Sequence, residues 1–78
     1  MDDVEKRIYY DIITNTWKIF SKKRNYEEFS DDWWQDILDE FDTYCKQFKD
    51  TEYEEIVDGI VTTLLAEHTR RYRKWRTQ

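Results

Sequence analysis

The scarcity of turn-forming residues is the feature that most restricts how this chain can fold. Its 78 residues contain no proline and a single glycine. Tight β-hairpin turns depend on residues that adopt positive φ angles, and glycine supplies most of them. Hairpins are therefore disfavoured, whereas helices joined by short links need few such residues. The sequence predicts an all-α fold, in one domain near the lower size limit for a hydrophobic core.

The clearest helix is predicted in the last third of the chain, over residues 52–76. Thr51 and Glu54 have the spacing of a capping box, which places the helix start directly after Thr51. At about 1.5 Å per residue, this helix is longer than the other segments can cover, so its basic end should reach the edge of the fold. Apolar and aromatic residues recur at helical spacing along it: Tyr53, Ile56, Val57, Ile60, Val61, Leu64, Leu65, His68, Tyr72 and Trp75.

Two earlier helices are predicted over residues 3–24 and 31–49. Asp2 and Ser30 are the expected N-caps, because their side-chain oxygens can accept from the backbone N–H groups of a first helical turn. Asn25 is expected in the left-handed conformation that often ends a helix.

The second helix is expected to bury a stripe of alternating three- and four-residue steps: Trp34, Leu38, Phe41, Cys45 and Phe48. Trp33 is then expected at the rim of the core, with its ring partly exposed. The link around Asp50 is very short, so the second and third helices should pack antiparallel. The whole chain, residues 1–78, is thus predicted to form a compact three-helix bundle with up-down-up topology and short connections.

Acidic and basic residues are unevenly distributed within the formal net charge of −5. Between residues 27 and 58 there are thirteen acidic residues and two lysines. The helical spacing predicts an acidic surface on the second and third helices, formed by Asp32, Asp36, Asp39, Glu52, Glu55 and Asp58. With Trp33 and Tyr44 at its rim, this surface is expected to bind a basic site on another protein. The alternative is that these carboxylates only keep the protein soluble.

Two further surfaces stand as alternatives. Tyr10, Ile13 and Trp17 form a second apolar line on the first helix, which a monomeric bundle covers incompletely and which suits a homodimer. The basic end instead suits contact with nucleic-acid phosphates through Arg70, Arg71, Arg73, Lys74 and Arg76. Tyr72 and Trp75 are the aromatic residues available there for base stacking.

Catalysis and metal binding have little support in the sequence. His68 is the only histidine, and it is expected to be a half-buried helix residue without a paired nucleophile. Cys45 is the only cysteine, so no internal disulfide can form. A structural zinc site needs about four thiolate or imidazole ligands, and one chain offers only Cys45 and His68, so zinc would need ligands from several chains. We therefore expect no enzyme activity, no metal and no cofactor.

The sequence predicts a soluble cytoplasmic protein. No apolar run of about 18 residues is present to span a membrane, and the first thirty residues are too charged for a signal peptide.

The segments Ser30–Ile37 and Lys49–Tyr53, with the helix that follows, resemble small acidic, aromatic-rich helical accessory proteins of bacteriophages and prophages. Anti-CRISPR counter-defence inhibitors belong to this type. The resemblance implies a non-catalytic protein in the host cytoplasm that binds another macromolecule, such as a nuclease of a defence system. A purely structural homo-oligomer is the remaining alternative.

Overall fold

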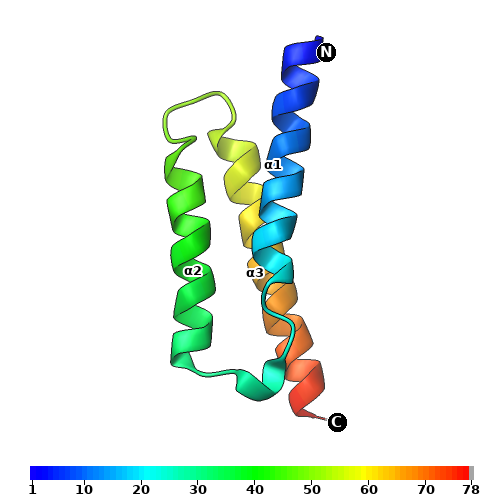
Figure 1. The fold of residues 1–78 in the computed structure, drawn as a ribbon, viewed down its shortest axis with the longest axis vertical. Coiled ribbons are helices and arrows are strands. Elements are labelled where there is room, and N and C mark those ends of the chain that lie inside the picture. Colours follow the sequence, from blue (N-terminus) through cyan, green and yellow to red (C-terminus); the bar gives the residue numbers. More distant parts are fainter. Residues whose placement is uncertain (78) are drawn as a thin grey trace.

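The computed structural model describes residues 1–77 and confirms the three-helix bundle (Figure 1). It contains the helices α1 (Asp3–Ser21), α2 (Asp31–Lys46) and α3 (Glu54–Arg76), with a short 3-10 helix, η1 (Tyr26–Glu28), between α1 and α2. The helices α1 and α3 run in the same direction, and α2 runs in the opposite one. Every pair of α-helices is in contact. The bundle is elongated, measuring 46 × 20 × 17 Å, because the first turns of α1 and the last turns of α3 extend past the other helices at opposite ends.

Side-chain caps fix the starts of α1 and α2 where the sequence predicts them. An Asp2 carboxylate oxygen accepts from the backbone N–H of Glu5 at 2.8 Å. The Ser30 hydroxyl accepts from the backbone N–H of Trp33 at 3.1 Å. Both caps satisfy N–H groups that have no partner within the helix, so these boundaries follow from local chemistry.

The link between α1 and α2 is longer than predicted. The helix α1 ends at Ser21 instead of residue 24. Asn25 does not adopt a left-handed conformation; its φ is −97°, and its side chain caps η1 by accepting from the N–H of Glu27. The residues that were expected to extend α1 therefore form a segment that passes beside the second half of α3 (Figure 1).

The turn between α2 and α3 is also longer than predicted. The helix α2 ends at Lys46 and α3 begins at Glu54, so the capping box expected at Thr51 does not form. Its two side chains stabilise the turn instead: the Thr51 hydroxyl accepts from the N–H of Tyr53, and the Glu54 carboxylate accepts from the N–H of Asp50 at 2.9 Å. The chain reverses at Asp50, whose φ of 63° lies in the left-handed region.

The core lies where the three helices meet. Its buried apolar residues are Ile12, Phe20, Trp33, Ile37, Phe41, Val57 and Val61. The expectation that Trp34 points into the core while Trp33 lies at its rim is wrong: Trp33 is only 5 % exposed, and Trp34 is half-buried. The cause is the α1–α2 connection, because Tyr26 and Phe29 pack over Trp33 with ring centroids 5.6 and 5.1 Å away.

Candidate functional site

Besides Val4 in its first turn, α1 has three exposed large hydrophobic side chains: Tyr10 at 65 %, Ile13 at 60 % and Trp17 at 59 %. They lie beside the side of α1 that contacts α3, which includes Tyr9 and Phe20. With about 100° of rotation per residue, Ile13, Trp17 and Tyr10 follow Tyr9 and Phe20 around the helix, in the direction away from α2. The line that the sequence singles out is therefore not covered by the bundle.

The neighbouring helix α3 continues this apolar surface. Tyr53 contacts Tyr9 of α1, with ring centroids 5.5 Å apart. Ile56 and Ile60 lie on the flank of Tyr53 that points away from α2, since the buried Val61 lies on the other flank. A shallow groove of about 420 Å³ follows this flank, lined by Ile56, Gly59, Ile60, Thr63 and Leu64.

Together these residues form one surface on the side of the bundle opposite α2. We call it the α1–α3 face and define it by Tyr10, Ile13, Trp17, Ile56 and Ile60. The sequence indicates its α1 half, but it assigns Ile56 and Ile60 to the core stripe. That stripe is too broad for two neighbouring helices to cover, and its breadth is the sequence feature that could have indicated the α3 half.

One end of the α1–α3 face opens into a pocket of about 400 Å³ beneath the α1–α2 connection. Its lining consists of Trp17, Phe20, Ser21, Lys23, Arg24, Tyr26, His68 and Arg71. Three of these side chains are cationic and none is a carboxylate, but Lys23 also lies 3.5 Å from Asp36 and Arg71 binds Glu67. Arg24 forms no ion pair with a described residue, so it leaves this end of the face with a positive charge that attracts anions. Sequence reasoning did not identify Lys23 and Arg24 as site residues, because only the folded connection brings them beside Trp17.

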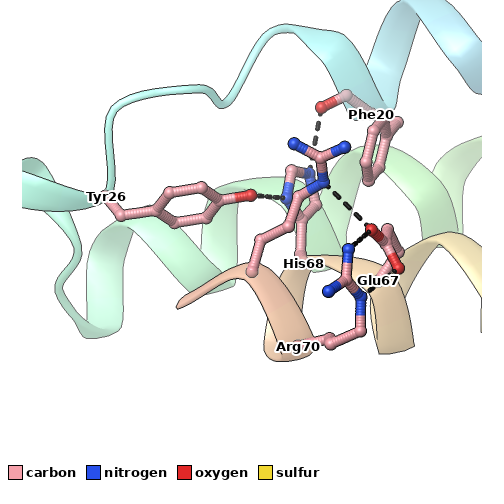
Figure 2. Close-up of polar contacts among 6 residues, drawn as sticks. Phe20, Tyr26, Glu67, His68 and Arg70 are labelled. Atoms are coloured by element: carbon pink, nitrogen blue, oxygen red, sulfur yellow. Dashed lines mark hydrogen bonds and ion pairs between the residues drawn. The ribbon is translucent and has the colours of Figure 1, made fainter. Parts of the chain in front are cut away.

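His68 forms the inner wall of the pocket and holds the connection in place (Figure 2). It is 1 % exposed, so the expectation of a half-buried histidine is wrong. Its Nε2 lies 3.0 Å from the backbone carbonyl of Phe20, and its Nδ1 lies 2.9 Å from the hydroxyl of Tyr26. Because a carbonyl only accepts, Nε2 carries the proton and Nδ1 accepts from Tyr26. Burial lowers the pKa of His68, which keeps the ring neutral, and both ring nitrogens are occupied.

The acidic residues are exposed, but several have cationic or polar neighbours. Asp36 lies 3.5 Å from Lys23, and Asp39 accepts from the side chain of Gln35 at 2.8 Å. Asp58 lies in a groove between α2 and α3 with Asp39, Asp42 and Cys45 among its lining residues. Asp32, Glu52 and Glu55 are exposed as well. Asp36, Asp39 and Asp58 thus face different neighbours.

The aromatic rim expected for the acidic surface is only partly present. Tyr44 is half-buried and packs against Phe48, with ring centroids 5.3 Å apart. Trp33 is buried beneath the connection, so its ring is not partly exposed at the rim as expected.

The basic end of α3 divides into two parts. Glu67 binds both Arg70 and Arg71, whose Nε atoms lie 2.9 and 3.0 Å from its carboxylate oxygens. The hydrogen bond from Arg70 is the main cause that lowers the pKa of Glu67 to about 2. Farther along, the exposed cations are Arg73, Lys74 and Arg76.

The two aromatic residues at this basic end differ in how freely a base could stack on them. Phe29 of the connection stacks on Tyr72, with ring centroids 3.9 Å apart. One ring face of Tyr72 is therefore already covered. Trp75 is 39 % exposed and is the more accessible of the two.

Within residues 1–77, histidine, cysteine and acidic side chains form no group of three or more that could hold a metal ion. None of the described helices combines the length and apolar character needed to cross a membrane.

The pKa of the Cys45 thiol is raised to about 11. Burial is the larger cause, and the negative charge of Asp58 is the next.

The comparisons with known proteins found no similarity: no family model matches the chain, and no curated protein or solved structure matches it significantly.

Proposed function

We propose that this chain is a non-catalytic protein-binding module and that the α1–α3 face is its binding surface. The observation that carries the proposal is the exposure of Tyr10, Ile13 and Trp17, each about 60 % or more, beside the groove that contains Ile56 and Ile60. Contiguous exposed apolar surface is unfavourable in water and typical of interfaces. Tryptophan and tyrosine are also the residues that most often dominate interface energetics.

The physical basis of binding would be the removal of this apolar area from water. Each Å² buried contributes about 25 cal/mol, before the cost of association is subtracted. The shape suits an elongated partner, because α1 and α3, which carry the exposed apolar residues, run parallel to each other (Figure 1). A helix that lays its apolar side chains into a groove is a common recognition mode of this kind.

A narrower version of the proposal follows from the resemblance to phage accessory proteins. In it, the partner is a nucleic-acid-handling protein of a defence system, and binding inhibits it. The exposed charges of Asp32, Asp36 and Asp39 would then accelerate the encounter with a basic surface, while the apolar contact would hold the complex together.

Two variants distinguish the α1–α3 face from the acidic surface. The first is Trp17→Glu, and the second replaces Asp32, Asp36 and Asp39 with asparagine. Thr62→Glu is the matched control, because it introduces the same charge at an exposed position of α3 away from the face. Each protein is used to capture partners from the cells that produce it, and binding of each identified partner is then measured with purified components.

Trp17→Glu should weaken binding by about tenfold or more, as expected when a hot-spot residue is lost, while Thr62→Glu binds normally. The triple asparagine variant should mainly slow association and reduce its dependence on salt. If Trp17→Glu binds normally and the triple variant loses binding, the acidic surface is the binding site and the proposal is wrong. Helix content measured by circular dichroism must be unchanged for either result to count.

A further inference from the structure

The two ends of the α1–α3 face carry opposite charge. Because α1 and α3 are parallel, both helices begin at one end of the bundle and finish at the other (Figure 1). Asp2, Asp3 and Glu52 lie at the end where α1 and α3 begin, with Lys6 as a cation among them. The opposite end has the pocket lined by Lys23, Arg24 and Arg71, of which Arg24 forms no ion pair with a described residue. The parallel pair thus has an apolar centre between an acidic and a basic end.

Such a surface is complementary to itself when one copy is turned end over end. A twofold axis perpendicular to the helices places the acidic end of each copy on the basic end of the other. The apolar centres then meet, and α1 and α3 of both copies form a four-helix core. We infer, as a more specific form of the proposed function, that the occupant of the α1–α3 face is a second copy of this chain in antiparallel orientation.

The spacing of residues along α1 agrees with this orientation. With the axis beside Ile13, a residue that precedes Ile13 lies opposite one that follows it by about the same number of positions. Tyr10 precedes Ile13 by three positions and Trp17 follows it by four, so each Tyr10 ring lies against Trp17 of the second copy. Asp3 precedes Ile13 by ten positions. On the other side of Ile13, α1 ends at Ser21, eight positions on, and Ser21 lines the pocket together with Lys23 and Arg24, so each Asp3 carboxylate lies near the cationic pocket of the second copy.

The helix α3 fits the same arrangement. Tyr9 contacts Tyr53 and Phe20 contacts His68, so the part of α3 level with Ile13 is the part that contains Ile56 and Ile60. The two isoleucines therefore lie on either side of the axis, so Ile56 of each copy faces Ile60 of the other. The projecting start of α1 then lies beside the α1–α2 connection of that copy.

The arrangement is tested with the full chain by equilibrium sedimentation over a range of protein concentrations. The wild-type protein should change from one to two chains per particle as concentration rises. Trp17→Glu should raise the dissociation constant by about tenfold or more, because each dimer loses two apolar contacts and gains two buried charges. Thr62→Glu should leave the dissociation constant unchanged.

Charge reversals test the orientation. Asp3→Lys and Arg24→Glu should each weaken dimerisation, on the order of fivefold, because each places like charges together twice per dimer. The variant that carries both changes should recover nearly wild-type affinity, since each pair is again opposite in sign. Asp31→Lys is the matched control for Asp3→Lys: both residues occupy the first position of a helix, but Asp31 begins α2, away from the face.

Each contrary result identifies what is wrong. If the single reversals have no effect while Trp17→Glu disrupts the dimer, the face self-associates in another orientation and the antiparallel arrangement is overturned. A wild-type protein that stays monomeric at every concentration overturns self-association altogether. The proposed function then depends only on whether Trp17→Glu abolishes binding to a different protein. If Trp17→Glu affects neither self-association nor partner binding, both the inference and the proposed function fail.

Discussion

The imidazole of His68 stacks on the ring of Phe20, with centroids 4.1 Å apart, and hydrogen-bonds the backbone carbonyl of the same residue. That carbonyl belongs to the last turn of α1, where helical carbonyls have no partner within the helix. Tyr26 completes the arrangement by donating to the other ring nitrogen. One side chain of α3 thereby fixes the end of α1 and the start of the connection, and so sets the shape of the cationic pocket.

The buried state of His68 predicts a specific loss of stability in mild acid. Burial lowers the pKa of His68 in the folded protein, so the unfolded chain binds this proton more readily. The contribution of His68 is fully present above the unfolded pKa of about 6.5 and decreases as the pH falls below it. The free energy of unfolding, measured with urea between pH 8 and pH 5, should decline with falling pH.

His68→Gln provides the control, because its amide can still donate to a carbonyl but does not titrate. Its free energy of unfolding should decline less over the same range, although it is lower at pH 8 by about 1–3 kcal/mol through lost packing and hydrogen bonding. Parallel pH curves for the two proteins would show that other groups cause the decline. Glu67, with its pKa of about 2, titrates below this pH range.

The burial of Trp33 predicts that this residue matters for folding. Trp33→Ala should reduce the free energy of unfolding by about 3–5 kcal/mol, because it removes a large buried ring and leaves a cavity. A domain of this size has only about 3–5 kcal/mol in total, so the variant should be largely unfolded. Trp34→Ala, at a half-buried position, should cost roughly 1–2 kcal/mol. Thermal unfolding followed by circular dichroism distinguishes them, and equal effects would contradict the burial pattern.

The left-handed conformation of Asp50 predicts opposite effects of two substitutions. Asp50→Gly should preserve or raise the free energy of unfolding by up to about 1 kcal/mol, because glycine adopts positive φ without strain. The backbone N–H that bonds Glu54 is retained. Asp50→Val should lower the free energy of unfolding by about 1–2 kcal/mol, because a branched side chain is strained at this φ. A valine variant as stable as the wild type would show that the turn adopts another conformation.

The environment of Cys45 predicts an unreactive thiol. Its pKa of about 11 leaves almost no thiolate at neutral pH, and the thiolate is the species that reacts with alkylating reagents. Iodoacetamide should therefore modify Cys45 far more slowly than free glutathione at pH 8. Asp58→Asn should speed the reaction, because it removes a negative charge that raises the pKa. A reaction as fast as that of glutathione would contradict the raised pKa.

The sequence by itself determined the class of fold and the starts of two helices. Scarce glycine and absent proline favour helices, and the Asp2 and Ser30 caps act on backbone groups within the next three residues. The sequence also predicted that Tyr10, Ile13 and Trp17 are incompletely covered in a monomer. These residues lie so far around α1 from its core stripe that the helices packed on that stripe cannot cover them as well. Each of these features depends only on local chemistry or on the period of a single helix.

Only the tertiary structure decided which neighbouring side chain is buried. Trp33 and Trp34 differ by about 100° around α2, and either could face a core whose direction is unknown. Trp33 is the buried one because Tyr26 and Phe29 of the α1–α2 connection pack over its ring. The same connection brings Lys23 and Arg24 beside Trp17 and buries His68. These contacts join residues distant in sequence, so they depend on the path of the connection across α3, which the period of an individual helix does not specify.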